Sequence, residues 1–141
     1  MADGPIELTI VTPDRAVVHE FVDELQIPGA GGYFGVLPGH APLFSELKVG
    51  EVAYRKGTRW LFTSVAWGFV EVVSNQVRIL AERAERAHEI DVERAMRAKQ
   101  RAEERMARRT DDIDYERALA SLERALIRIQ VNKKSGPPPP A

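Results

Sequence analysis

The sequence predicts an all-β domain, a sandwich or a barrel, followed by an antiparallel pair of α-helices. Nine of the ten glycines lie between Gly4 and Gly68, and no proline occurs between Pro42 and Pro137. Charged side chains become much denser after about residue 80. Because glycine and proline favour turns and interrupt helices, short strands are expected first and long helices later.

The first part of the chain contains strand-like segments separated by turn signals. Ile6, Leu8 and Ile10 alternate with polar residues, which is typical of a half-buried strand. Thr12-Pro13-Asp14 then predicts a turn. Further strands are expected at residues 22–27, ending at Pro28-Gly29, and at residues 51–55, 59–65, 69–73 and 77–80, with turns at residues 56–58 and 74–75. Seven or more short strands indicate a β-sandwich or barrel.

The second part contains an internal repeat. Residues 90–95, Ile-Asp-Val-Glu-Arg-Ala, recur as residues 113–118, Ile-Asp-Tyr-Glu-Arg-Ala. In each copy the aspartate, Asp91 or Asp114, is expected to cap a helix by accepting hydrogen bonds from free backbone N–H groups. The two helices are expected at about residues 92–108 and 115–131, and the short link between them makes them antiparallel neighbours.

The apolar residues of the second helix follow a 4-3-4-3 spacing, typical of a coiled-coil seam. They are Tyr115, Leu119, Leu122, Leu126 and Ile129. The matching positions of the first helix are mostly small and include Lys99, so they bury little area. The hairpin is therefore expected to be marginal by itself, and to need docking or to adopt more than one arrangement.

The expected organisation is a β domain over residues 1–87, a helical hairpin over residues 88–131 and a disordered proline-rich tail over residues 132–141. The chain has 141 residues, a net charge of −1 and no cysteine, which excludes disulfides and thiol nucleophiles. His19, His40 and His88 lack metal-ligand spacing, and no phosphate-loop motif is present. The sequence therefore predicts neither a catalytic site nor a metal site, which argues against a small enzyme.

Arginines gather on one face of each helix. At about 100° per residue, those of the first helix fall within about 80° of one another and those of the second within about 40°. They are Arg94, Arg97, Arg101, Arg105 and Arg108, then Arg117, Arg124 and Arg128. Three interpretations stay open: a solvated face, a surface for an acidic protein or a nucleotide, and a nucleic-acid-binding module. The near-neutral net charge argues against the last.

Several motifs, in order along the chain, resemble the epsilon subunit of F-type ATP synthases. Residues 35–43, Gly-Val-Leu-Pro-Gly-His-Ala-Pro-Leu, resemble the signature of that family. Residues 11–14, 68–72 and 77–81 are also similar to it, as are the helix starts at residues 90–95 and 111–114. The resemblance covers about residues 6–131.

The resemblance implies a ten-stranded β-sandwich followed by two helices, in a non-catalytic subunit that requires no cofactor. Such a subunit belongs to the central stalk and couples proton flow to rotation. Its implied partners are the gamma subunit and the ring of c subunits, with Tyr33, Phe34 and His40 in the contacting loop. Its implied place is the cytoplasmic face of the bacterial plasma membrane, reached through partner subunits alone.

The resemblance also implies a regulatory role for the helices. They can extend along gamma toward the catalytic beta subunits and inhibit ATP hydrolysis. Arg117, Arg124 and Arg128 are then the expected contacts with acidic segments of beta and alpha.

Some members of the family bind ATP on the folded hairpin through the motif Ile/Leu-Asp-x-x-Arg-Ala. The matching residues here are Ile90, Asp91, Arg94 and Ala95, joined by Glu85 and Arg101 at similar positions. Arginines on one face can hold a triphosphate, but the same residues also make an ordinary capped helix start.

Two positions depart from the family pattern. Tyr33 stands where many members carry an acidic residue, in the loop expected to face the c ring. Trp67 places a bulky ring where glycine is common.

Overall fold

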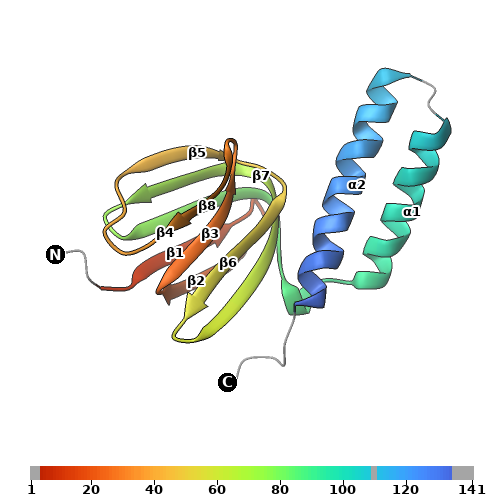
Figure 1. Ribbon diagram of the computed structural model, residues 1–141. Helices are drawn as coiled ribbons and strands as arrows, with labels where there is room; N and C mark the ends of the chain where they lie inside the picture. Colours follow the sequence, from red (N-terminus) through yellow and green to blue (C-terminus); the bar gives the residue numbers. More distant parts are fainter. Residues whose placement is uncertain (1–3, 109–110, 135–141) are drawn as a thin grey trace. The chain divides into compact units, whose positions relative to one another are not determined.

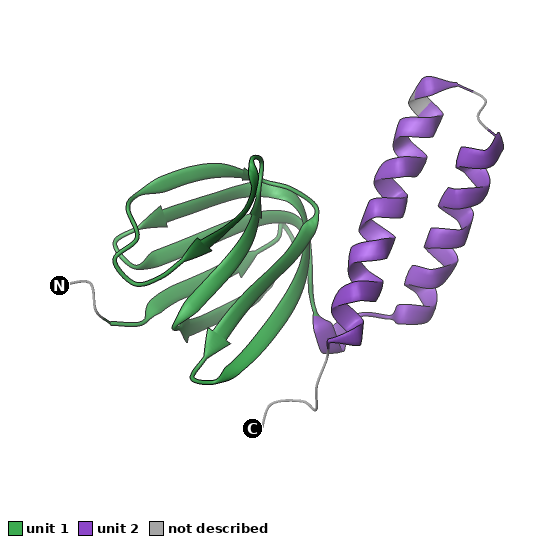
Figure 2. Cartoon of the chain, in the orientation of Figure 1, with its two compact units in different colours: residues 1–86 green, residues 87–141 purple. Residues whose placement is uncertain are grey.

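The computed structural model describes residues 4–108 and 111–134 and divides into two compact units, residues 1–86 and 87–141 (Figure 2). The division lies one residue before the domain boundary expected from the sequence. In the described residues, unit 1 holds eight strands, and unit 2 holds a short 3-10 helix and two α-helices (Figure 1).

The strands of unit 1 form two layers that share their longest members. They are β1 (Ile6–Val11), β2 (Ala16–Val22), β3 (Glu24–Gly29), β4 (Gly32–Val36), β5 (Leu43–Leu47), β6 (Gly50–Lys56), β7 (Arg59–Val73) and β8 (Gln76–Arg86). One layer has the order β2-β1-β8-β7-β5, and the other has the order β4-β3-β6-β7-β8. The β1–β8 pair is parallel, and the other pairs named here are antiparallel.

The described residues thus form eight strands, where about ten were expected. The long β7 and β8 account for the difference, because each runs through both layers and so gives every layer five members. The strand expected over residues 22–27 is present with different bounds. β2 ends at Val22 and β3 begins at Glu24, and β3 continues through Pro28, whose carbonyl still accepts the Lys48 N–H at 2.9 Å.

Alternating side chains from both layers fill the core. Ile6, Leu8 and Ile10 are fully buried, as their alternation predicted. Tyr54 also faces the interior, where burial raises the pKa of its hydroxyl well above the ordinary value and the nearby Glu20 carboxylate raises it further. The hydroxyl therefore stays protonated at neutral pH.

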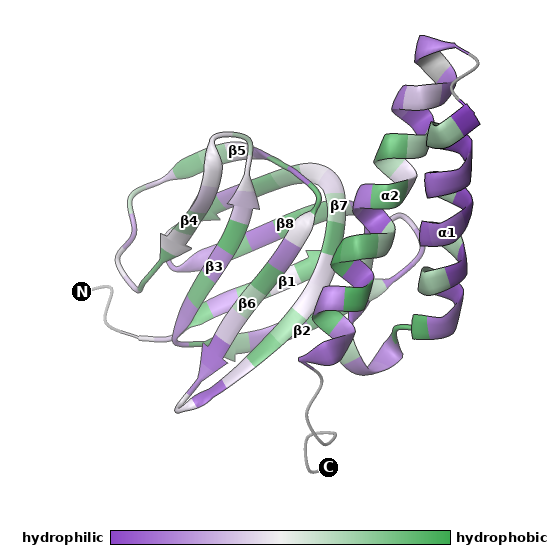
Figure 3. Cartoon of the chain, turned by 45° about the vertical axis from the view of Figure 1, so that its right-hand side comes forward, coloured by the Kyte–Doolittle hydropathy of each residue, from purple (hydrophilic) through white to green (hydrophobic). Residues whose placement is uncertain are grey.

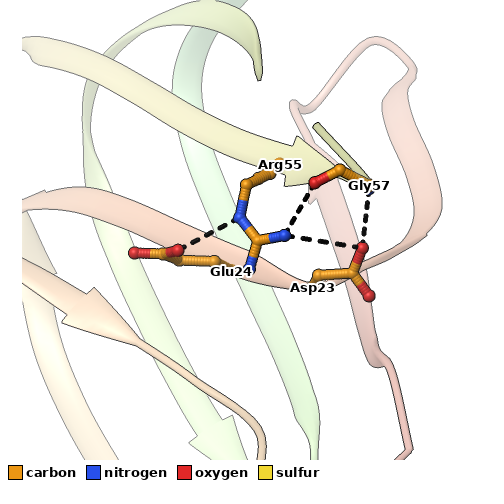
Figure 4. Close-up of polar contacts among 4 residues, drawn as sticks. All are labelled: Asp23, Glu24, Arg55 and Gly57. Atoms are coloured by element: carbon orange, nitrogen blue, oxygen red, sulfur yellow. Dashed lines mark hydrogen bonds and ion pairs between the residues drawn. The ribbon is translucent and has the colours of Figure 1, made fainter. Parts of the chain in front are cut away.

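A polar cluster joins the β2–β3 connection to the β6–β7 turn (Figure 4). Arg55 Nε donates to Glu24 Oε1 at 3.2 Å, and Arg55 Nη1 donates to the Gly57 carbonyl at 2.7 Å. Asp23 Oδ2 accepts the Gly57 N–H at 2.7 Å and lies 4.0 Å from Arg55 Nη1. One guanidinium group therefore holds two carboxylates and a turn in place.

The bend of β7 at residues 67–68 carries the chain from one layer to the other. β7 pairs with β6 up to Val65 and with β5 from Gly68 onward. Trp67 has a φ of 53° and Gly68 a φ of 138°, both in the left-handed region that favours glycine. A glycine at position 67 would adopt this φ without strain. A tryptophan there carries backbone strain of about 1–3 kcal/mol.

Unit 2 begins with η1 (Ala87–Glu89), followed by α1 (Val92–Arg108) and α2 (Asp112–Lys133). The bounds of α1 are those expected, and the predicted Asp91 cap is confirmed, because its Oδ1 accepts the Arg94 N–H at 3.1 Å. The predicted Asp114 cap is wrong. Asp111 caps α2 by accepting the Asp114 N–H at 2.6 Å, so α2 starts three residues earlier than expected.

The end of α2 also differs from the expectation. α2 continues through Asn132 and Lys133, which were assigned to the tail, because their backbone extends the helical hydrogen-bond pattern. The predicted disorder of the remaining tail concerns residues 135–141, which lie outside the described residues.

The two helices meet through alanines. Ala95 and Ala102 of α1 and Ala118 and Ala125 of α2 are each at most 2% exposed. The expectation that Leu119 and Leu126 lie in the seam is wrong, because they are 37% and 44% exposed. Small side chains let two helices approach closely, and the larger Met96 of α1 is itself 57% exposed. Each buried methyl group contributes only about 0.8 kcal/mol, so the seam is weaker than a leucine seam.

A substitution at the β7 bend tests the two-layer architecture. Gly68→Ala should lower the free energy of unfolding of the sandwich by about 2 kcal/mol or more, because the new Cβ would overlap the Leu80 carbonyl and the φ is positive. Chemical denaturation followed by tryptophan fluorescence measures the change. Gly31→Ala is the control, since nothing lies within 4 Å of its Cβ position. Equal effects at the two positions would contradict the assignment of the bend.

A second substitution tests the alanine seam. Ala102→Leu should destabilise the hairpin by about 1–3 kcal/mol, because a large side chain would force the helices apart. Thermal melting followed by far-ultraviolet circular dichroism reports mainly on α1 and α2. The exposed Ala107→Leu is the matched control and should change the melting little. If Ala107→Leu proved as harmful as Ala102→Leu, the helices would not meet where the structure places them.

Candidate functional site

The residues that match the ATP motif have two kinds of environment. Ile90 and Ala95 are buried in unit 2, and Asp91 is the cap of α1. Arg94 and Arg101 are exposed, seven residues apart on one face of α1. The two guanidinium groups are therefore the members of the motif available to a ligand, and guanidinium groups bind phosphate oxygens in a bidentate manner.

Glu85, the sixth residue of this set, belongs to the other unit. It lies on β8 opposite Ser64, whose hydroxyl donates to the Glu85 carbonyl at 3.5 Å. Five of the six predicted residues therefore lie in unit 2, and Glu85 lies in unit 1.

The remaining arginines of α1 differ in their exposure and contacts. Arg97 and Arg108 are exposed, in line with the arginine face expected from the sequence. Arg105 instead donates to Asp114 Oδ1 at 2.7 Å, across the connection between the helices. The exposed positive surface of α1 is thus made by Arg94, Arg97, Arg101 and Arg108.

The three arginines assigned to inhibitory contacts differ in their exposure to solvent. Arg117 is exposed near the start of α2, whereas Arg124 and Arg128 are half-buried. Arg124 Nη2 donates to Ser121 Oγ at 3.0 Å, within one turn of the same helix. Arg117 is therefore the member most accessible to a partner in this structure.

Two contacts that hold the hairpin were not found from the sequence. The Arg105–Asp114 pair joins the end of α1 to the start of α2, and both side chains are 38% exposed. At the other end, Asn132 Nδ2 donates to the carbonyls of Ala87 and Ile90 at 3.4 and 3.5 Å. Opposite charges on both sides of a short helix connection were the signal for the first contact. The second contact could not be predicted, because Asn132 was assigned to the tail.

The residues predicted to face the gamma subunit and the c ring do not form one cluster. At the start of β4, the Tyr33 hydroxyl accepts the Glu51 N–H at 2.9 Å, so its polar atom is engaged within the chain. Phe34 packs against the core. His40 follows the end of β4, and its Nδ1 lies 2.6 Å from the Ala41 carbonyl oxygen. The structure therefore places Tyr33 near the start of β4 and His40 after its end.

The loop that contains His40 is fastened to the β7–β8 turn. Gly39 N–H donates to Asn75 Oδ1 at 2.8 Å, and the Asn75 carbonyl accepts the Glu7 N–H at 2.9 Å. Leu37 in the same loop is exposed. A fixed loop that presents an apolar side chain is suited to contact with another protein.

An apolar patch on the outer face of the sandwich was also missed by sequence reasoning. Phe44, Phe69 and Leu80 are 67%, 46% and 57% exposed, although they lie on three neighbouring strands. The two phenyl rings stack with their centroids 5.6 Å apart, and Phe69 pairs with Leu80 across β7 and β8. The signal was present in residues 69–73, where Val70 and Val72 face the core and Phe69 must face outward. Exposed apolar patches mark interaction surfaces.

Two further properties bear on the class of protein. Within residues 4–108 and 111–134, no group of three or more His, Asp or Glu side chains is arranged to hold a metal ion. No helix in this part of the chain has the length and apolar character needed to cross a membrane.

The chain matches two family models, one for each unit. Residues 5–87 match the β-sandwich domain of the ATP synthase delta/epsilon chain, and residues 88–133 match its long α-helix domain. Among solved structures, a chain of the Euglena gracilis mitochondrial ATP synthase covers 90% of this chain and 80% of its own length, with a TM-score of 0.77 and 24% identity. That likeness supports the fold alone.

Curated relatives are similar over most of their length. The ATP synthase epsilon chain of Geotalea daltonii is 46% identical over 132 residues, which are 93% of this chain and 96% of the relative. That of Syntrophobacter fumaroxidans is 48% identical over 130 residues, 92% of this chain and 97% of the relative. That of Koribacter versatilis is 53% identical over 106 residues, 75% and 74% of the two chains. The chain therefore belongs to the family of ATP synthase epsilon chains, which are non-catalytic subunits of that enzyme.

Proposed function

We propose that this chain is a rotor subunit that couples proton translocation to ATP synthesis and restrains ATP hydrolysis through its helices. The observation that carries the proposal is the construction of unit 2. Its helices are closed by small alanines, while Leu119, Leu126 and Arg117 of α2 are exposed. A helix pair that is weakly closed and exposes such side chains is suited to exchange one set of contacts for another.

The sandwich is the attachment site in this proposal. Its outer apolar patch, Phe44, Phe69 and Leu80, is of the kind that a partner protein covers, and gamma is the proposed partner. The fixed loop with Leu37 and His40 is proposed to contact the c ring. Attachment to the cytoplasmic side of the plasma membrane would then be made through these subunits.

The contacts that hold the hairpin closed are weak, so opening it costs little free energy. The Arg105–Asp114 pair is more than one-third exposed on both sides, and such pairs contribute about 0–1 kcal/mol. The alanine seam adds a few buried methyl groups. Once open, α2 would present Arg117, Arg124 and Arg128 to acidic segments of beta and alpha.

Removal of unit 2 tests the inhibitory role. An assembled ATP synthase whose chain ends at Arg86 should hydrolyse ATP faster than the complex with the full chain, because the inhibiting element is absent. The control ends at Lys134, which keeps both helices and should leave the rate unchanged. Equal hydrolysis rates for the complexes with the chain ending at Arg86 and with the full chain would show that unit 2 does not restrain hydrolysis.

ATP is the proposed regulatory ligand of unit 2. Arg94 and Arg101 are exposed on one face of α1, where they can bind phosphate oxygens. A ligand bound to the closed hairpin would stabilise that state, and ATP would then hold the helices away from the catalytic subunits.

Thermal denaturation tests the ATP proposal. ATP at about 100 times its Kd should stabilise the isolated chain by about 2.7 kcal/mol, and Arg94→Ala should remove that gain. Arg117→Ala is the control, because Arg117 is the exposed equivalent of Arg94 in the internal repeat. An unchanged melting temperature at millimolar ATP would contradict the proposal, as would equal losses in the two variants.

A further inference from the structure

The connection between β4 and β5 contains a tight turn. The His40 N–H donates to the Leu37 carbonyl at 3.1 Å, with Pro38 and Gly39 between them. Gly39 has a φ of 86°. Proline in the second position and a glycine of positive φ in the third are typical of a type II β-turn. The hydrogen bond of such a turn joins its first and fourth residues, so the Gly39 N–H needs an acceptor from elsewhere in the chain.

Asn75 provides that acceptor. The Gly39 N–H donates to Asn75 Oδ1 at 2.8 Å, although the two residues lie 36 positions apart in the sequence. Asn75 belongs to the turn between β7 and β8, and Figure 3 shows this turn and the β4–β5 connection at the same end of the sandwich, as does Figure 1. The Asn75 backbone carbonyl also accepts the Glu7 N–H at 2.9 Å. Asn75 therefore joins the connection both to the β7–β8 turn and to β1.

The β7–β8 turn by itself does not require the side chain of Asn75. Val73 pairs with Gln76, so Ser74 and Asn75 form a two-residue hairpin turn. Their φ values are 50° and 61°, as in a type I′ turn, whose two central residues both have positive φ. Glycine adopts such values without strain. Glycine at position 75 could thus close the hairpin, but it would offer no side-chain oxygen to the Gly39 amide.

The residues that this contact holds are exposed. Leu37 is 56% exposed, and Ala41 and Pro42 are exposed as well. Residues 37–42 lie between strands, so individual contacts determine their conformation. When an exposed loop is already fixed, less conformational entropy is lost as a partner binds it. The hydrogen bond from Gly39 to Asn75 therefore bears on binding as well as on folding.

We propose that Asn75 is the positioning residue of the partner-binding loop, which we define as residues 37–42. Its side-chain oxygen orients the Gly39 peptide and thereby Leu37 and His40, so the affinity of the chain for its partner depends on this oxygen. The inference rests on the proposed function, in which the loop contacts the c ring. It adds a role in binding for a residue that the sequence assigned only to a turn.

Amide hydrogen exchange on the free full-length chain tests the anchoring. Asn75→Gly keeps the positive φ but removes the oxygen, so the Gly39 amide should exchange about fivefold faster or more. Asn75→Asp keeps an oxygen acceptor and should keep the protection. Ser74→Gly is the matched control, because it alters the same turn and leaves Asn75 in place.

Binding to an ATP synthase complex depleted of this chain tests the role in affinity. The depleted complex is titrated with the fluorescently labelled full chain. Asn75→Gly should bind about two- to tenfold more weakly, the range that one hydrogen bond contributes. Asn75→Asp and Ser74→Gly should bind like the unmodified chain.

Three results would overturn the inference: unchanged exchange of the Gly39 amide in Asn75→Gly, unchanged affinity of that variant, or equal losses of affinity in Asn75→Gly and Ser74→Gly. The last result would assign the effect to the hairpin turn alone.

Leu37→Ser separates failure of this inference from failure of the proposed function, because it removes an exposed side chain of the loop and leaves the anchor in place. If Leu37→Ser weakens binding and Asn75→Gly does not, the loop contact stands and the inference fails. If Leu37→Ser binds like the unmodified chain, the loop contact of the proposed function is itself contradicted.

Discussion

Close contact between small side chains determines how the helical unit behaves. Ala95 and Ala102 meet α2, and Ala118 and Ala125 meet α1, so the two backbones approach closely while burying little apolar area. Polar contacts at the two ends of the hairpin orient the helices but contribute little stability. At one end Arg105 pairs with Asp114, and at the other Asn132 donates to the carbonyls of Ala87 and Ile90. The same packing leaves Leu119 and Leu126 exposed. A hairpin built on leucines would be more stable, but it would have no apolar face left for another partner.

The sandwich, in contrast to the helical unit, is firmly packed. β7 and β8 pass through both layers, so the layers cannot separate without bending or breaking two long strands. Branched and aromatic side chains fill its interior, and Gly68 permits the close approach of β7 to β8 at the bend. Three large apolar side chains remain exposed on its outer face, those of Phe44, Phe69 and Leu80. Unit 1 is firmly packed and has an apolar outer patch, whereas unit 2 is weakly closed and exposes Leu119, Leu126 and Arg117. Such a combination suits the proposed subunit, which is attached through one part and regulates with another.

Local signals in the sequence predicted much of this fold, because they depend on neighbouring residues. The bounds of α1, its Asp91 cap and the turns at residues 56–58 and 74–75 follow from capping and turn chemistry. The seam could not be predicted in the same way. Periodicity shows that Leu119 and Leu126 share a face, but only the packing of the two helices decides that alanines meet instead. The repeat assigned the cap of α2 to Asp114, whereas Asp111 is the cap in the folded chain. For the ATP motif, the sequence identified the exposed Arg94 and Arg101, while Ile90 and Ala95 serve the interior of unit 2.

The hairpin is expected to open far more easily than the sandwich unfolds. Native-state hydrogen exchange on the unmodified chain, followed amide by amide at low denaturant, measures both opening free energies in one sample. Amides of α1 and α2 should share an opening free energy well below that of the amides of β1 and β8. One opening free energy common to both units would contradict it.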